Sequence, residues 1–355
     1  ISSSYQEIQR FEEDKANPLG IFPTTHGSGQ EWYGDEFSNL RNKDYSILFD
    51  LSDILLDKPI QVRSEFISRS SVPTIYELTI GNEIITKNIG SVRTGDVEAI
   101  HGRKAIVNEN IILPNDRPEI SIHYPPVASE SKGWIDFIEL KFRRTLALKD
   151  NPIIVRDPLS QNYSSFGFEI QRGATDATLV WDITNPEAPT SIALSENNWA
   201  YATGSELKSF LVFDPNQINV PNSSAVAIEN QNLHGIVDAD LIIVYHKNWK
   251  KSAQRLAEHR RDYSNLNVEI VDVEHIYNEF SSGRQDASSI RDFAKMVRDR
   301  SENFRYLLLL GDGSYDFRGI DQTIPSESFV PTYETHESLD PLEAFPSDDY
   351  FAQLD

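Results

Sequence analysis

Two aspartates in the last fifty residues are the first candidates for chemistry. Asp312 and Asp316 lie in a Gly/Asp turn directly after the apolar run Tyr306–Leu310. A carboxylate that follows a buried strand is a common cation ligand, and Ca²⁺ prefers oxygen ligands. Further carboxylates follow in the sequence at Asp340, Glu343, Asp348 and Asp349. The spacing therefore predicts a cleft or a structural Ca²⁺ site built from Asp312, Asp316, Asp348 and Asp349, with Asp312 and Asp349 as the metal ligands.

These aspartates also have a second interpretation, because Asp and Gly stabilise tight turns through local hydrogen bonds. Three histidines, His246, His275 and His336, could serve as bases or as structural hydrogen-bond partners. No nucleophile accompanies them, since the chain contains no cysteine and none of the motifs G-x-S-x-G, H-E-x-x-H, G-x-G-x-x-G or the P-loop. No complete catalytic constellation can therefore be assembled from this sequence.

The elements that would position these side chains follow a βαβαβ pattern. Short apolar runs at Leu241–Tyr245, Val268–Val273 and Tyr306–Leu310 are typical of buried parallel strands. Between them, residues 249–260 have helical spacing, and Asp286 is the expected N-cap of a second helix. The ends of parallel strands meet at one edge, where open α/β sheets bind ligands. His246, Glu274-His275 and Asp312 should lie along that edge.

Residues 44–214 alternate apolar and polar side chains with period two, which favours antiparallel sheets arranged as a β-sandwich or jelly roll. The inward-facing positions are predicted in four runs: Tyr76, Leu78 and Ile80; Ile120, Ile122 and Tyr124; Ile138, Leu140 and Phe142; Phe166, Phe168 and Ile170. The predicted organisation is an irregular arm over 1–43, this β-rich region, a linker over 215–238, and half of a parallel α/β sheet over 239–355.

Composition excludes some partners and favours an exported protein. The 33 Lys and Arg residues face 55 Asp and Glu residues, giving a formal charge of −22. Such a chain repels phosphate backbones, so nucleic acid is not an expected partner. The absence of cysteine and the single methionine suit an oxidising, non-cytoplasmic compartment. Because the chain begins with Ile1 and shows no membrane-length apolar segment, we expect a piece of a longer exported protein.

Several strings resemble the gingipain-type cysteine peptidases, and among them the sortases of the type IX secretion system. They are Leu241-Ile-Ile-Val-Tyr-His246, Val273-Glu-His-Ile-Tyr-Asn-Glu-Phe-Ser-Ser-Gly-Arg-Gln-Asp286, Ile290-Arg-Asp-Phe293, Tyr306–Asp316 and, in the β-rich region, Gly133-Trp-Ile-Asp-Phe-Ile-Glu-Leu140 and Gln231-Asn-Leu-His-Gly235. The resemblance covers nearly the whole chain. It implies a β-sandwich-like region followed by the first half of a caspase-like α/β domain.

The resemblance also implies a function for the full-length protein. A Cys/His pair would remove the C-terminal secretion signal of cargo proteins at the outer surface of the cell. The cargo would pass by transpeptidation to anionic lipopolysaccharide, with an outer-membrane β-barrel as tethering partner and no required cofactor. No catalytic residue carries over, because the family's His and Cys are expected after Asp355 and this chain has no Cys. The strand-like run Phe351–Asp355 supports truncation, so the chain alone is predicted to be inactive.

Two other functions fit the same residues. The chain could be a non-catalytic module that binds cargo or the barrel partner. It could also be a metal-dependent α/β hydrolase that uses the Asp312 cluster.

Overall fold

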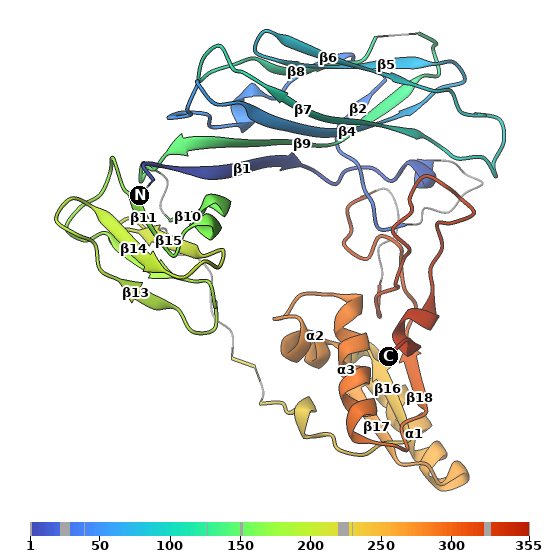
Figure 1. Ribbon diagram of the computed structural model, residues 1–355. Coiled ribbons are helices and arrows are strands. Elements are labelled where there is room, and N and C mark those ends of the chain that lie inside the picture. The colour runs from blue at the N-terminus through green and yellow to red at the C-terminus, as the bar shows by residue number, and fades with distance from the viewer. Residues whose placement is uncertain are drawn as a thin grey trace. The chain divides into compact units, whose positions relative to one another are not determined.

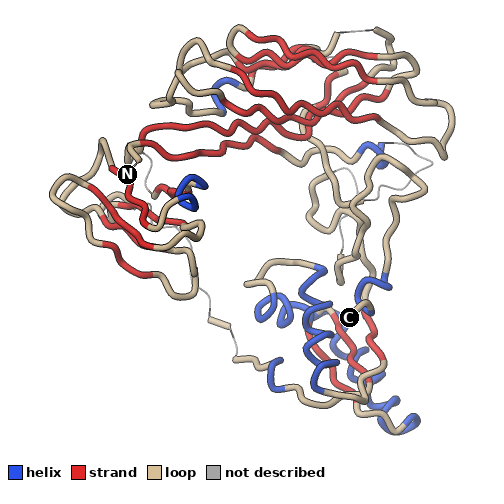
Figure 2. The backbone as a smooth tube through the Cα atoms, viewed as in Figure 1, coloured by secondary structure: helices blue, strands red, loops and turns tan. Residues whose placement is uncertain are grey.

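The chain folds into two compact units, and successive segments of the sequence belong alternately to one unit and the other. The computed structural model describes residues 2–21, 29–38, 40–125, 127–149, 152–218, 227–228, 230–322 and 328–354. The first unit comprises Ile1–Glu13, Gly34–Val92 and Arg103–Ser224, and the second comprises Asp14–Tyr33, Arg93–Gly102 and Ala225–Asp355. The described α-helices all fall within the second unit, whereas the first is built of strands (Figure 2).

The larger part of the first unit is a sandwich of two antiparallel sheets (Figure 1). One sheet has the order β1-β9-β4-β7, with β2 also paired to β9, and the other has the order β3-β8-β5-β6. The strands are β1 (Ser4–Glu12), β2 (Glu36–Phe37), β3 (Asn42–Asp44), β4 (Ile60–Arg69), β5 (Thr74–Ile80), β6 (Glu83–Ile89), β7 (Arg103–Ile111), β8 (Ile120–His123) and β9 (Lys132–Thr145).

The alternating pattern buries one face of each sheet against the other. The inward positions predicted on β5, on β8 with the following Tyr124, and on β9 are all buried, which confirms the sandwich. Phe66 stacks on Tyr76 with ring centroids 4.6 Å apart, so the two sheets interlock through aromatic side chains. The hydroxyl groups in this core are satisfied, because Tyr76 and Ser64 share a hydrogen bond of 2.8 Å.

A smaller β module completes the first unit. It contains a sheet of order β10-β15-β12-β13 and the pair β11-β14, around a core that includes Phe168 and Phe210. The predicted inward positions Phe166, Phe168 and Ile170 are buried here. The strands are β10 (Ile153–Arg156), β11 (Ser165–Glu169), β12 (Leu179–Asp182), β13 (Thr190–Ile192), β14 (Trp199–Thr203) and β15 (Ser209–Phe213), with the 3-10 turn η3 (Pro158–Asn162) after β10.

The arm predicted to be irregular over 1–43 contains a long strand instead. β1 pairs antiparallel with β9 from Ser4 opposite Thr145 to Glu12 opposite Phe137. Its side chains are mostly polar or half-buried, so the period-two pattern that marks other strands is weak here. The prediction was wrong over this stretch because pairing to an established sheet overrides a weak local pattern.

The second unit contains a three-stranded parallel sheet of order β17-β16-β18. Leu241, Ile243 and Tyr245 pack with α1 on one face, while Ile242 and Val244 pack with α2 and α3 on the other. Figure 1 labels these three helices beside β16, β17 and β18. The elements are β16 (Leu241–Tyr245), α1 (Lys250–Ser264), β17 (Val268–Asp272), α2 (Val273–Phe280), α3 (Ala287–Arg300) and β18 (Tyr306–Leu310). This is the predicted half of a parallel α/β sheet.

The helices follow the predicted spacing with two corrections. Asp286 caps α3 by accepting a hydrogen bond from the Ser288 N–H at 2.8 Å, as expected, and the dry face of α3 is fully buried. Val273, however, opens the unpredicted helix α2 rather than ending β17, because Asp272 accepts from the Glu274 N–H and caps that helix. Trp249 precedes α1 and is 42% exposed, so it is not part of the buried helix face.

Two segments far from the sheet in sequence also belong to the second unit. Trp32 stacks on Tyr315 at 5.8 Å, the Gln30 N–H donates to the Thr335 carbonyl at 2.9 Å, and Arg318 pairs with Asp14 at 2.8 Å. Segment 93–102 joins them through a hydrogen bond of 2.7 Å from the His101 N–H to the Leu339 carbonyl. The segment after β18 is therefore held by residues that precede the sheet by more than a hundred positions.

Two further predictions differ from the structure. The linker expected over 215–238 lies partly outside the described residues, but its last part contains the 3-10 turn η4 (Leu233–Gly235) and the buried side chain of Leu233. The strand-like run expected from Phe351 falls instead in the 3-10 turn η6 (Asp348–Ala352), and Phe351 is buried in the core beside α3. Within the described ranges, no helix has the length and apolar character needed to cross a membrane.

Candidate functional site

The carboxyl edge of the parallel sheet gathers the strand ends that the sequence predicted. Tyr245 lies opposite Asp272 of β17 on one side and opposite Leu310 of β18 on the other. The residues that follow, His246, Val273 and Gly311, therefore emerge at the same edge. This register confirms the predicted edge, because parallel strands in register carry their next residues to one side of the sheet.

His246 has a structural role at this edge. Its Nδ1 accepts a hydrogen bond of 3.4 Å from the Asn248 N–H, which caps the 3-10 turn η5 (Lys247–Trp249). Its ring lies 5.3 Å from the Phe329 ring, and Trp249 meets the same phenyl ring edge-on at 5.8 Å. His246 therefore holds the turn that follows β16 and packs against Phe329.

Two glycines allow a later segment to cross the end of β18. A methyl group on Gly313 would lie 2.0 Å from the Thr332 Oγ1 and 3.0 Å from the Val330 carbonyl oxygen. Gly311, at φ +155°, would place the same group 2.7 Å from the Phe329 Cβ. The Gly-Asp-Gly string therefore serves close backbone approach, and the Asp312 carbonyl accepts from the Phe329 N–H at 2.9 Å.

The side chain of Asp312 is exposed, and its hydrogen bond is to the neighbouring residue. Its Oδ1 accepts from the adjacent Gly313 N–H at 3.0 Å. Asp316 differs, because it is 1% exposed and both of its carboxylate oxygens are bonded. They accept from the N–H groups of Ile320 at 2.9 Å and Asp321 at 2.7 Å. Asp316 therefore has the second of the two roles predicted from the sequence: its carboxylate stabilises the turn that follows β18 through hydrogen bonds to backbone amides.

The other two aspartates of the predicted cleft are exposed in the first turn of η6. Among the residues that the structure describes, no three His, Cys, Asp or Glu side chains are grouped to hold a metal ion, so Asp312, Asp316, Asp348 and Asp349 do not form such a group. A Ca²⁺ ion on Asp312 and Asp349 stays a prediction. His275 and His336 are both exposed and lie in α2 and in the loop before η6.

Glu279, near the end of α2, organises the entry to the sheet, and the sequence did not reveal it. Its carboxylate accepts from the Leu233 N–H at 2.8 Å, from Gln231 Nε2 at 2.9 Å and from the His234 backbone N–H at 3.3 Å. The ring of His234 also lies against the Phe280 ring with centroids 4.9 Å apart. Burial opposes the charge, but the hydrogen bonds from Leu233, Gln231 and His234 outweigh it and lower the pKa of Glu279 to about 2.

The edge also carries an exposed ion pair that links two strand ends. Lys247 Nζ lies 2.7 Å from Glu274 Oε1. Exposed pairs of this kind contribute little stability, and no pattern in the sequence marks them. Taken together, this edge provides histidine and carboxylate side chains on a rigid sheet but no thiol, since the chain contains no cysteine. It can orient a substrate or a second half of a site, and it lacks the nucleophile of a cysteine peptidase.

Comparison with known families and structures agrees with this architecture. Residues 237–355 match Peptidase family C25. The crystal structure of dimeric latent PorU from Porphyromonas gingivalis is similar over 100% of this chain, with a TM-score of 0.79 and 22% sequence identity. The chain spans 34% of the length of that structure. The expected resemblance to the gingipain-type peptidases is confirmed, and the fold is that of the corresponding part of PorU.

Other similarities are far weaker. The insecticidal delta-endotoxin Cry8Ea1 from Bacillus thuringiensis matches 24% of this chain and 16% of its own length, at 17% identity and a TM-score of 0.19. The CBM36-1 domain of a multidomain xylanase from the hindgut metagenome of Trinervitermes trinervoides matches 39% of this chain and 94% of its own length, at 11% identity and a TM-score of 0.21. Similarities this low carry no argument about fold or function. No curated protein matches the chain.

Proposed function

We propose that this chain is the amino-terminal part of a C25-type cysteine peptidase that acts as a sortase. In this proposal the catalytic His and Cys follow residue 355 and complete the edge that β16, β17 and β18 begin. The thiolate would attack the scissile carbonyl, the histidine would activate it, and donors at the edge would stabilise the oxyanion. The 355 residues alone would form a platform without peptidase activity.

The observation that carries the proposal is the parallel half-sheet itself. Residues 237–355 match Peptidase family C25, and the whole chain has the fold of a third of PorU. A chain without cysteine cannot supply the nucleophile of that family. The same similarity motivates the finer proposals: cargo proteins with a C-terminal secretion signal as substrates, lipopolysaccharide as acceptor, an outer-membrane β-barrel as partner, and the cell surface as location.

The test compares the full-length gene product with residues 1–355 on a substrate protein that carries a C-terminal secretion signal. We expect the full-length protein to release the signal and iodoacetamide to abolish this activity, because the nucleophile is a thiol. Residues 1–355 should show no cleavage and no mass shift with iodoacetamide. Cleavage by residues 1–355 alone, or full-length activity that survives complete alkylation, would contradict the proposal.

A second readout separates a sortase from a simple peptidase. The product mass is measured with and without an added amine nucleophile. Transpeptidation predicts a product joined to the amine, whereas hydrolysis adds only water. Hydrolysis alone in the presence of excess amine would reduce the proposal to a peptidase.

A further inference from the structure

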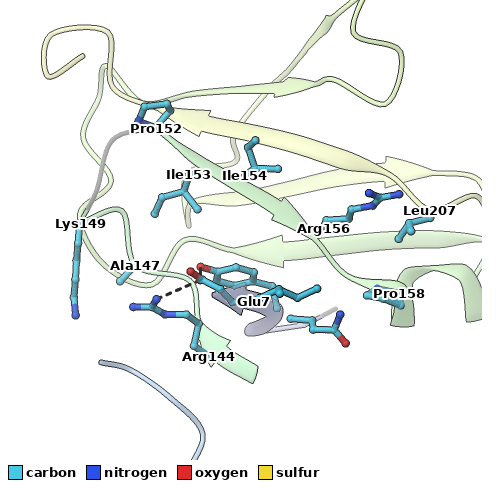
Figure 3. A pocket seen from close by; sticks show the side chains of 13 residues that line it. Glu7, Arg144, Ala147, Lys149, Pro152, Ile153, Ile154, Arg156, Pro158 and Leu207 are labelled. Atoms are coloured by element: carbon cyan, nitrogen blue, oxygen red, sulfur yellow. Dashed lines mark hydrogen bonds and ion pairs between the residues drawn. The ribbon is translucent and has the colours of Figure 1, made fainter. Parts of the chain in front are cut away.

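A cavity in the first unit lies between the two outermost strands β1 and β10. Its volume is about 510 Å³, and it opens to solvent. Figure 3 shows Ile153, Ile154 and Arg156 on one wall and Glu7 and Arg144 on the other. Nothing in the proposed peptidase reaction uses this cavity.

The residues that line the cavity show that it runs along the edges of strands and not across the face of a sheet. Four consecutive residues of β1, from Tyr5 to Ile8, line it, as do the neighbours Ile153 and Ile154 of β10. Successive side chains of a strand point to opposite faces. A hollow that consecutive residues line therefore runs beside the backbone, where a strand has no partner.

The backbone edge of β1 is open at this position. β1 ends the sheet order β1-β9-β4-β7, so only one of its edges is paired. Within the described part of the chain, residues 5–8 make no backbone hydrogen bond outside the β1–β9 ladder. In an antiparallel strand, every second residue directs its N–H and C=O away from the paired side. Unpaired groups on the free edge of a strand can receive another extended chain.

β10 forms the opposite wall and is a poorer acceptor for a strand. Pro152 precedes it and Pro158 follows it by two residues, and proline is a residue that shields sheet edges from pairing. Its side chains instead give the cavity its chemistry. Ile154 is 60% exposed, and Ile8 of β1 is 55% exposed, so both offer aliphatic surface to an occupant.

The charged groups of the cavity favour an acidic occupant. Arg144 is neutralised by Glu7 at 3.2 Å and Asp50 at 3.0 Å, and Lys149 pairs with Asp53 at 2.5 Å. The Arg156 guanidinium is exposed and has no hydrogen bond or ion pair within the described residues. The positive charge of this exposed guanidinium attracts a carboxylate.

We propose that the groove between β1 and β10 binds an extended segment of a partner protein, paired as an added strand on the free edge of β1. The segment alternates aliphatic side chains, which contact Ile8 and Ile154, with acidic side chains, one of which reaches Arg156. Main-chain pairing supplies affinity, and the two walls supply selectivity.

The test uses a fluorescein-labelled octapeptide of alternating valine and glutamate, titrated with residues 1–355 by fluorescence polarisation. We expect saturable binding that I154D and R156E each weaken by about tenfold or more. The matched control is I84D, because Ile84 is 64% exposed on the outermost strand β6 and lies outside the cavity. An octapeptide of valine and lysine should not bind. Far-UV circular dichroism verifies that each variant is folded.

Backbone pairing has its own readout. Two octapeptides N-methylated on odd or even residues remove the amide donors of one edge each, so one of the two should lose binding by about tenfold or more. Hydrogen exchange of residues 5–8 should slow when the unmodified peptide binds. Equal binding by both methylated peptides, an equal effect of I84D and I154D, or no saturation at about 1 mM peptide would overturn the proposal. Displacement by decanoate with unchanged exchange in β1 would identify an acyl site and overturn it as well.

Discussion

The Nδ1 atom of His234 lies 2.6 Å from the Glu279 Oε2 atom, which joins the segment before β16 to the last turn of α2. The same carboxylate accepts from Gln231 and from the backbone of Leu233. One side chain therefore holds the stretch of chain that enters the parallel sheet. Its loss should loosen the entry without touching any strand.

Replacing this carboxylate should destabilise the second unit. We expect E279Q to lower its free energy of unfolding by about 1–3 kcal/mol, the usual loss for hydrogen bonds to a charged group. Urea unfolding followed by the helical circular dichroism signal measures this, because the described α-helices lie in the second unit. The control is E258Q on the exposed face of α1, which should change the free energy by less than about 0.5 kcal/mol. Equal effects of the two variants would refute the role of Glu279.

The same residue predicts a pH dependence. Its folded pKa of about 2 lies below the value of about 4.3 for an unfolded glutamate. A depressed carboxylate pKa stabilises the folded state above the unfolded pKa, and this stabilisation is lost as pH falls through the folded pKa. The difference in unfolding free energy between the native sequence and E279Q should therefore be constant above about pH 6 and should shrink from about pH 4 towards pH 2. A difference that stays constant down to pH 2 would contradict the shift.

Residues 329–332 pass close to the backbone of Gly311 and Gly313 at the end of β18, so a larger residue at Gly313 should destabilise the second unit. G313A should destabilise the second unit by about 1–3 kcal/mol, because its methyl group would meet Thr332 at 2.0 Å. T332A removes the nearest atom, so G313A should cost less in that background, and a double-mutant cycle in urea measures the difference. G95A is the control, since a methyl group there would meet no atom within 4 Å. Additive costs for G313A and T332A would show that the crossing is not the source of strain.

The buried turn carboxylate distinguishes a structural role from a metal site. D316N leaves one acceptor oxygen for two N–H groups, so amide exchange at Ile320 and Asp321 should accelerate by about tenfold or more. The exposed Asp349 provides the control, because D349N should leave both amides unchanged. Addition of Ca²⁺ to the native sequence should not alter these rates if Asp316 acts only on the turn. Slower exchange with Ca²⁺ that D349N abolishes would instead assign the aspartates to a metal site.

The sequence best predicts the elements whose buried positions form a clear apolar run or an apolar stripe. The run Leu241–Tyr245 and the stripe of α3 are buried as predicted. Tyr306–Leu310 forms the predicted strand but is only half-buried, with Tyr306 exposed, because β18 ends the order β17-β16-β18. β1 was not predicted from the sequence, because it is stabilised by pairing with β9 and its own side chains show little apolar alternation. α2 was not predicted either, because Asp272 both ends β17 and caps α2, so no loop separates the strand from the helix.

The candidate site was predicted less completely for a different reason. The common edge of His246, Val273 and Gly311 follows from strand order and register, which the apolar runs determine. The partners of Asp316 and Glu279, by contrast, are backbone amides in loops. Backbone amides exist at nearly every residue, so residue types carry no information about which of them a carboxylate will meet.

The hydrogen bond between Gln30 and Thr335 also constrains the order of events during synthesis. Residues 14–33 leave the ribosome first, yet their partners in the second unit emerge some three hundred residues later. Closing so long a loop costs conformational entropy before any contact offsets it, and such topologies fold slowly. The β-sandwich can therefore form from residues 1–145 alone, whereas the parallel half-sheet acquires its last contacts only when the segment through Phe351 is present.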